Sequence, residues 1–349
     1  YISSTLGIAE KLVLKAIAKS SGRSTKEINK KMQELGDTGL VAEEFLKQKA
    51  FTLVPTGELT STELYQTLHK IKDIDGSGSQ DHKEKILISM FQKTIGKESK
   101  YLARIILGNM RLGVADMTVL DALSICFTGD KTNKKRLERA YNVCPDIAEI
   151  AKQLAEKGID HIDEIPIKVG RPIRVMLAQR VATLSDMSDK IKSKLFQVEA
   201  KYDGERVQVH KKRDSSIILY SRRMENITEQ LPDLVEYLQK EINVIATEYI
   251  LEGEIMALSE DAKSHQNFQT LMQRKRKTEI EKYIKKVPVA LYVFDLLYLN
   301  GKSLMNEALQ KRGEEIDKIL YKKNRIRRIE MIQTKSIDEV QTFFEKMLK

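Results

Sequence analysis

The sequence predicts two domains of different fold class: an all-α domain over residues 1–168, followed by an α+β domain with largely antiparallel strands over residues 169–349. The length of 349 residues favours two domains over one. In the first half apolar residues recur at helical spacing, and no proline occurs between Pro55 and Pro145. Short runs rich in β-branched and aromatic residues dominate the second half.

The all-α prediction rests on a series of amphipathic segments. In the first of them, beginning near Ile8, apolar residues return along one helix face. The same spacing predicts helices over the segments 61–73, 81–94, 97–108, 117–128, 131–142 and 146–157. Connections that contain glycine and serine separate the helices, most clearly Gly76-Ser77-Gly78-Ser79. The first domain is therefore predicted to be a bundle of mid-length helices.

The domain boundary is predicted at the segment 165–172, where two prolines and a glycine interrupt regular structure. After it, β-type runs occur at 196–202, 205–210, 216–222, 249–256 and 288–299. Helical stretches at 227–241, 262–284 and 306–319 separate some of these runs. The second domain is therefore predicted to combine helices with antiparallel strands.

Composition restricts the classes of function. The formal net charge of +10 favours an anionic partner, and nucleic acid is the first candidate. With only Cys126 and Cys144, neither a disulfide framework nor a four-thiolate metal site is possible. No apolar run reaches the ~18 residues that a membrane span needs, and no signal peptide is visible, so we expect an intracellular protein without a membrane partner. The chain opens at Tyr1 instead of methionine, which predicts a fragment.

The most informative segment is Phe196-Gln197-Val198-Glu199-Ala200-Lys201-Tyr202-Asp203-Gly204-Glu205-Arg206. Alternation along a strand places Glu199 and Lys201 on one face. Asp203-Gly204 is a turn signal, and Arg206 would open a returning strand, so the segment predicts a hairpin. A carboxylate and a lysine beside a tight turn suit a small-molecule site. The four-letter pattern Lys-x-Asp-Gly taken alone fits a surface hairpin with an ion pair equally well.

Later strands add features in a recognisable order. The strand over 217–223 ends in cations that include Arg222, and the strand over 251–256 carries Glu252 and Glu254 on one face. A long apolar strand over 289–299 then holds Phe294. Further strings are Gly76-Ser77-Gly78-Ser79-Gln80-Asp81, Arg111-Leu112-Gly113-Val114, Met176-Leu177-Ala178, Phe268-Gln269, Arg274-Lys275-Arg276-Lys277 and Phe294-Asp295-Leu296. With these motifs the chain resembles the ATP-dependent DNA ligases of the archaeal and eukaryotic replicative class, within the covalent nucleotidyltransferase superfamily.

The resemblance implies a covalent mechanism in which ATP and Mg²⁺ are the cofactors. Lys201 would attack the α-phosphorus of ATP and form a lysyl-AMP intermediate with loss of pyrophosphate. AMP would then pass to the 5′-phosphate at a nick, and the 3′-hydroxyl would displace it. Such a reaction serves DNA replication, repair and recombination.

The resemblance also implies which residues bind the nucleotide. Glu199 would accept a hydrogen bond from the adenine amino group, and Phe294 would stack on the adenine ring. Arg206 and Arg222 would contact the ribose and the phosphates, or the nick phosphate once AMP is attached. Glu254 would hold the ribose or a Mg²⁺ ion.

The helical half resembles the DNA-binding domain of this class, which grips the minor groove on both sides of a nick through phosphate contacts. Glycine-containing turns that lead into helix N-termini suit this task, since free backbone N–H groups point at phosphate. Lys83 and Arg111 are the candidate side-chain contacts. The implied partners are nicked duplex DNA and a sliding clamp. The implied state is a monomer, cytoplasmic if the source is archaeal.

The family pattern is incomplete in this chain. In the family the pattern continues past this point with a Glu-Gly pair and a motif lysine, and a C-terminal OB-fold barrel comes after them, but residues 301–349 contain no Glu-Gly pair. The expectation is a fragment with a shortened DNA-binding domain, an adenylation domain truncated at its C-terminus and no OB-fold, which on its own is inactive in nick sealing. Two alternatives remain open: an RNA ligase or capping-type nucleotidyltransferase, and a nick-binding module without catalytic competence.

Overall fold

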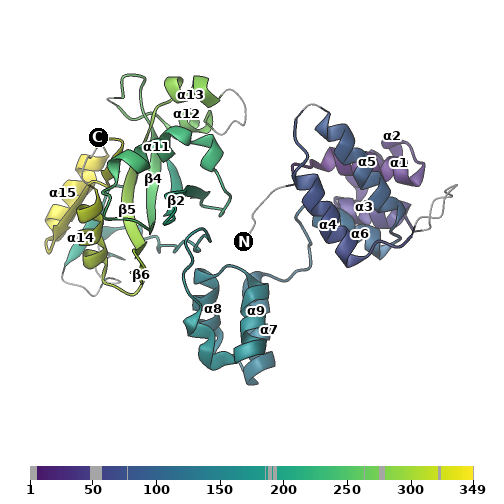
Figure 1. Cartoon of the computed structure of the whole chain (residues 1–349), viewed down its shortest axis with the longest axis horizontal. Helices are drawn as coiled ribbons and strands as arrows, with labels where there is room; N and C mark the ends of the chain where they lie inside the picture. Colours follow the sequence, from purple (N-terminus) through teal and green to yellow (C-terminus); the bar gives the residue numbers. More distant parts are fainter. Residues whose placement is uncertain are drawn as a thin grey trace. The chain divides into compact units, whose positions relative to one another are not determined.

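The computed structural model describes residues 6–47, 57–76, 78–184, 186–187, 191, 195–262, 264–274, 280–320 and 324–348. The chain divides into two compact units, Ile2–Ala115 and Asp116–Lys349. Figure 1 shows helices alone in the first unit, and helices together with strands in the second. Each unit is described by itself below.

The first unit is a helical bundle, as predicted. Its helices are α1 (Glu10–Ser21), α2 (Thr25–Leu35), α3 (Thr38–Phe45), α4 (Ser61–Lys72), α5 (Ser79–Gln92) and α6 (Lys97–Ile106). Ile17, Leu87 and Phe91 are fully buried in their shared core. The helices α3 and α6 approach closely at Gly39, where an added Cβ would lie 2.9 Å from the backbone oxygen of Lys100. Ser24 starts α2 with a capping box, in which its side chain and that of Glu27 exchange hydrogen bonds with backbone N–H groups.

The second unit begins with three further helices: α7 (Asp116–Thr128), α8 (Lys134–Val143) and α9 (Ile147–Lys157), followed by the 3-10 helix Ile159–Glu164. They pack around a separate apolar cluster that includes Leu120, Leu137 and Ile150. The division between the compact units therefore falls at 115/116, inside the helical half. The domain boundary predicted at 168/169 concerns a different property, the change from helices to strands, and stays a prediction.

A six-stranded sheet forms the body of the second unit. Its strands follow the order β3 (Ile217–Ser221), β2 (Glu205–Lys211), β4 (Tyr249–Ala257), β5 (Val289–Leu299) and β6 (Lys302–Ser303), and β7 (Ile326–Arg328) also pairs with β5. All neighbours are antiparallel except β5 and β7. This arrangement confirms the predicted α+β fold class. Figure 1 shows β2, β4 and β5 together with the nearby helices of this unit.

Strand alternation gives this sheet one apolar face. Val207, Leu251 and Leu291 lie on this face and belong to a buried cluster. Leu234 and Ile316 reach the same cluster from α11 (Pro232–Glu241) and α14 (Leu309–Ile319). In the described part of this unit there are also the 3-10 helix Thr228–Gln230 and the helices α12 (Phe268–Met272), α13 (Ile280–Lys286) and α15 (Ile337–Met347). Because the helices cover the apolar face, the polar side chains of the strands lie together on the opposite face.

The predicted hairpin around Asp203-Gly204 is wrong. The strand β1 (Phe196–Glu199) pairs antiparallel with β8 (Met331–Thr334), while β2 pairs with β3 and β4. Gly204 is not among the glycines with positive φ. An added Cβ at this position would lie 2.2 Å from the backbone oxygen of Ile255. The glycine thus allows the chain to pass against β4 as it leaves one sheet and enters the other.

Two other segments differ from expectation. The helix predicted over 227–241 begins only at Pro232, which suits the first turn because proline has no N–H to satisfy there. The stretch predicted as one helix over 262–284 contains α12 and α13, and residues 263 and 275–279 lie outside the described part. Among the described helices, none has both the length and the apolar character of a membrane span.

Candidate active site

The polar face of the six-stranded sheet gathers most of the predicted nucleotide-binding residues. In the register of β2 and β4, Arg206 lies opposite Glu254, and Gln208 lies opposite Glu252. Val207, which lies between Arg206 and Gln208 in the sequence, is buried in the apolar cluster on the other face. Strand alternation therefore brings two acids and a cation together, and the prediction that Glu252 and Glu254 share a face is confirmed.

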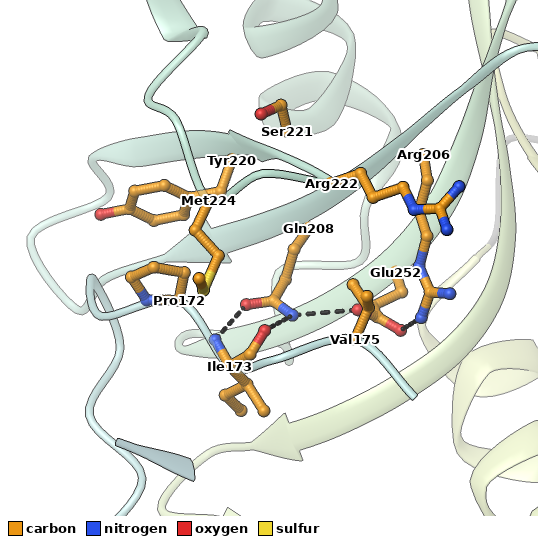
Figure 2. Close-up of a pocket in the computed structure, with 10 residues that line it drawn as sticks. All are labelled: Pro172, Ile173, Val175, Arg206, Gln208, Tyr220, Ser221, Arg222, Met224 and Glu252. Atoms are coloured by element: carbon orange, nitrogen blue, oxygen red, sulfur yellow. Dashed lines mark hydrogen bonds and ion pairs between the residues drawn. The ribbon is translucent and has the colours of Figure 1, made fainter. Parts of the chain in front are cut away.

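Arg206 is held by an acid that the sequence analysis did not assign. Its Nη2 donates to Glu252 Oε2, and Gln208 Nε2 donates to Glu252 Oε1 at 2.9 Å. Figure 2 shows these three side chains in a row. Glu252 is only 4 % exposed. Burial raises the pKa of its carboxyl, and the nearby positive charge of Arg206 opposes that rise.

Phe294 reaches the site because β5 contains a β-bulge. Glu252 pairs with Asp295, but the next residue of β4, Gly253, pairs with Val293, so Phe294 is an extra residue in the ladder. The guanidinium carbon of Arg206 lies 5.2 Å from the centre of the Phe294 ring, within cation–π distance. The bulge therefore gives the polar face an aromatic ring beside the arginine.

Lys201 lies just past the end of β1, and its side chain is exposed. It is close enough to Glu254 for its positive charge to act on that carboxyl. Burial is the larger influence, and it raises the pKa of Glu254 to about 7. The nucleophile predicted from sequence thus lies near an incompletely compensated carboxyl.

Glu199 lies at the end of β1, two residues before Lys201. Its Oε1 accepts a hydrogen bond of 2.6 Å from Gln197 Nε2. Burial raises the pKa of its carboxyl above the ordinary value; the hydrogen bond from Gln197 and the positive charge of Arg328 oppose this rise, and the negative charge of Asp295 adds to it. A half-buried carboxyl with a raised pKa is suited to a polar, uncharged ligand group.

Arg222 follows β3 and is exposed. It lines a small depression together with Arg206, Glu252 and Met224. In Figure 2 the Arg222 side chain extends toward that of Arg206. The two guanidinium groups give the rim of the site a positive charge, which suits phosphate.

The two DNA contacts predicted in the helical half have different surroundings. Lys83 is only 6 % exposed, and its Nζ donates to the carbonyl of Leu6 at 2.8 Å. This placement speaks against the predicted phosphate contact, because the amine is enclosed and already bonded. Arg111 has a half-exposed side chain, a positive φ of 48° and an ion pair of 3.1 Å with Asp37.

The other predicted basic and glycine-rich strings lie partly beyond the described residues. Ser77 and residues 275–277 are outside the described part of the chain. Gly78 has a positive φ of 80° and immediately precedes α5. Arg274 is buried, and its guanidinium pairs with Asp233 and the carbonyl of Val287, so it belongs to the interior.

Sequence reasoning missed Gln208, His210 and the role of Glu252. The signal was present in the alternation of Arg206, Gln208 and His210 with two valines, which is the pattern of a strand with one polar and one apolar face. Polar residues on a buried strand require partners, and Glu252 on the adjacent strand is one.

The surroundings fit ATP and Mg²⁺. The Nε atom of Arg206 is buried and has no hydrogen-bond partner among the described residues, which leaves a donor for a ligand. The described residues contain no group of three or more His, Cys, Asp or Glu side chains that could hold a metal ion. Mg²⁺ often binds through one or two carboxylates together with substrate phosphates, and Glu254 is the carboxylate that offers this.

Comparison with known proteins identifies the family. Residues 1–124 match the model of the DNA ligase N terminus, and residues 175–349 match the model of the ATP dependent DNA ligase domain. DNA ligase 1 of Methanosarcina acetivorans is 40% identical over 100% of this chain and 60% of its own length. DNA ligase 2 of Thermofilum pendens is 42% identical over 92% and 54%, and the DNA ligase of Sulfophobococcus zilligii is 42% identical over 97% and 57%.

The chain thus spans between half and two thirds of the length of these relatives. The two family models match in the order that the motifs predict, and the second, which begins at residue 175, includes β1, Lys201 and β2. The chain belongs to the ATP-dependent DNA ligase family.

Proposed function

We propose that this chain carries the adenylation site and a DNA-binding portion of an ATP-dependent DNA ligase that seals nicks. The observation that carries the proposal is the position of Lys201, an exposed amine near the incompletely compensated carboxyl of Glu254. Arg206 and Phe294 lie on the sheet face that holds this carboxyl. A nucleophile, a cationic group and an aromatic ring around one space suit attack on a nucleotide phosphate.

In the first step the neutral amine of Lys201 forms a bond to the α-phosphorus of ATP. The bond from that phosphorus to the oxygen bridging to the β-phosphate breaks, and pyrophosphate leaves with the electron pair. The AMP group then moves to the 5′-phosphate at a nick, which frees the lysine. Attack by the 3′-hydroxyl on the activated phosphate releases AMP and closes the strand.

The remaining predicted residues have roles that their surroundings support. Glu199, half-buried and held by a glutamine, accepts a hydrogen bond from the adenine amino group. Phe294 stacks on the adenine ring, and Arg206 with Arg222 contacts the ribose and phosphates. Glu254 holds the ribose or takes part with phosphate oxygens in binding Mg²⁺, whose charge stabilises the phosphate groups in the reaction.

The helical unit is proposed to bind the duplex on both sides of the nick. Arg111 remains the candidate side-chain contact, because half of its side chain is exposed. The loop that leads through Gly78 into α5 offers backbone N–H groups for phosphate. A sliding clamp as partner, a monomeric state and an intracellular location complete the proposal.

The intact mass of the chain after incubation with ATP and Mg²⁺ tests the proposal. The wild type and the control Lys335→Ala, which alters an exposed lysine beyond β8, are expected to gain one adenylyl group. Lys201→Ala is expected to gain none. Addition of GMP from GTP in place of AMP would favour the capping-type alternative. Salt-dependent DNA binding without any mass gain would favour the nick-binding module.

A further inference from the structure

The segment from Gly170 to Met176 is fastened to the polar face of the sheet by side chains of β2. The backbone N–H of Gly170 donates to His210 Nδ1 at 3.0 Å. Gln208 makes two bonds with Ile173: its Oε1 accepts from the N–H at 2.8 Å, and its Nε2 donates to the carbonyl at 3.1 Å. Figure 2 shows the Gln208 amide facing the Ile173 backbone.

Both the oxygen and the nitrogen of the Gln208 side-chain amide are engaged in hydrogen bonds. Besides the two bonds to Ile173, Nε2 donates to Glu252, and Oε1 lies 2.8 Å from His210 Nε2. His210 Nδ1 accepts from a backbone N–H, so its Nε2 carries the proton and donates to Gln208. A flipped amide would place its oxygen against both a carboxylate and a carbonyl. The orientation of Gln208 is therefore fixed by its neighbours.

The Gln208 amide also bonds to Glu252, the acid that holds Arg206. Glu252 has two carboxylate oxygens, one bonded to Gln208 and the other to Arg206. Gln208 and Glu252 are each 4 % exposed, and His210 is fully buried. Water therefore has little access to replace a missing partner, and loss of the amide would free the carboxylate to turn.

We propose that Gln208 is a positioning residue: it is itself held by Ile173 and His210, and through Glu252 it fixes the orientation of Arg206. The inference rests on the proposed function for what Arg206 does with the nucleotide. The contacts from Gln208 to Glu252 and from Glu252 to Arg206 do not depend on that function. Gln208 acts without touching the nucleotide.

Two substitutions separate this role from a general effect on the fold. Gln208→Met keeps approximate length and volume but removes both the donor to Glu252 and the bonds to Ile173. Tyr220→Phe is the matched control, because it removes the 2.6 Å bond from the Tyr220 hydroxyl to the Gly170 carbonyl. That bond fastens the same segment without involving Gln208 or Glu252.

The first measurement is solvent exchange of the Arg206 Nε–H by NMR on the full chain with ¹⁵N-labelled arginine, the signal being assigned by its loss in Arg206→Lys. Because this Nε is buried, exchange in the wild type is expected to be slow. Gln208→Met is expected to speed it about tenfold or more, and Tyr220→Phe to change it less than about twofold. Unchanged exchange in Gln208→Met overturns the proposal whether or not the chain takes up AMP.

The second measurement is the rate of AMP transfer to Lys201 at saturating ATP in the wild type, Gln208→Met, Arg206→Ala and the double variant. Gln208→Met is expected to lower the rate about tenfold in the wild type and less than about twofold beside Arg206→Ala. Equal losses in both backgrounds overturn the proposal, since a general structural defect would be additive. Absence of AMP transfer in the wild type counts against the proposed function, and NMR exchange then decides the positioning role.

Discussion

The helical unit has a buried carboxylate and the polar face of the sheet a half-buried one, and the two are in opposite electrostatic situations. In the helical unit Glu84 is 3 % exposed and pairs with Lys15 at 2.7 Å and Lys19 at 2.6 Å. These partners lower the pKa of its carboxyl. On the sheet, burial raises the pKa of Glu254 to about 7, and the charges of Lys201 and Arg206 only partly oppose it.

The opposite pKa shifts of Glu84 and Glu254 distinguish a carboxylate that stabilises the fold from one that is available to bind a ligand. A carboxylate that is fully paired stabilises the folded chain and has little left to offer. A carboxylate that is desolvated without full pairing gains when a cation or a hydroxyl binds beside it. Carboxyls with raised pKa values concentrate at functional sites; Glu252 and Glu254 lie on this sheet face, and Glu199 lies at the end of β1 in the two-stranded sheet.

The largest effect is expected for Lys201→Ala. Removal of the nucleophile should lower AMP transfer on the order of a thousandfold or more. Stability should change little, because the side chain is exposed. A rate assay with radiolabelled ATP together with thermal unfolding measures both. Retained AMP transfer would mean that another residue is the nucleophile. The difference between Glu84 and Glu254 would then no longer indicate where the reaction takes place.

The next effect is expected for Glu254→Gln, which should slow AMP transfer about a hundredfold. It should also change how stability depends on pH. The folded-state pKa of about 7 lies above the ordinary value of 4.5, so the folded wild type holds a proton that the unfolded chain releases. Raising the pH from 4.5 to 7 should therefore destabilise the wild type relative to the variant, by about 1–2 kcal/mol after allowance for solvent screening.

Hydrogen exchange of the strands β2 and β4 measures that stability difference, with wild type and variant compared at each pH. A difference that stays constant between pH 4.5 and 8 would show that Glu254 is fully compensated in the folded chain. The proposed difference between Glu84 in the helical unit and Glu254 on the sheet would then not hold.

A moderate effect of opposite sign is expected for Glu84→Gln. Loss of two ion pairs should cost the helical unit about 1–2 kcal/mol at neutral pH. The folded-state pKa of Glu84 is lowered, so its contribution is present above pH 4.5 and disappears as the pH falls through that lowered value. Hydrogen exchange of α1 and α5 should show wild type and variant converging in acid. Divergence in acid would contradict the assigned direction.

The smallest effect is expected for Ser24→Ala. The substitution removes the side-chain half of the capping box at the start of α2 and should cost about 1 kcal/mol locally. Increased exchange confined to α2, with AMP transfer unchanged, is the expected result. A change in AMP transfer would show that the helical unit influences the adenylation site.

Much of the fold was predictable from the sequence because it depends on local periodicity. The helices α1 and α4 to α6 and the strands β2 to β5 lie close to the predicted ranges, whereas α2 and α3 were not predicted. The pairing of β1 with β8 was not predictable, since it joins residues such as Phe196 and Thr334 that are far apart in the chain. Gly204 was interpreted as a turn residue, whereas its position against Ile255 depends on a neighbour that only the folded sheet provides.

The candidate site was predictable where the alternation of side chains along a strand alone decides which face of the sheet they occupy. Glu252 and Glu254 follow this rule, and the structure places both on the polar face. The burial of Lys83 was not predictable, because its partner is the carbonyl of Leu6 on a distant segment. A lysine at the start of a helix gives no local sign of whether it faces water or backbone.

The bulge at Phe294 has a consequence for how β5 tolerates sequence change. In a regular strand, two adjacent residues cannot both face one side of the sheet. The extra residue places Phe294 and Asp295 together opposite Glu252. Removal of either would make the ladder regular, and Val293 and Leu296 on the two sides would keep their faces. This stretch should therefore tolerate the loss of one residue as a strand, and what the polar face would lose is either the ring or the carboxylate.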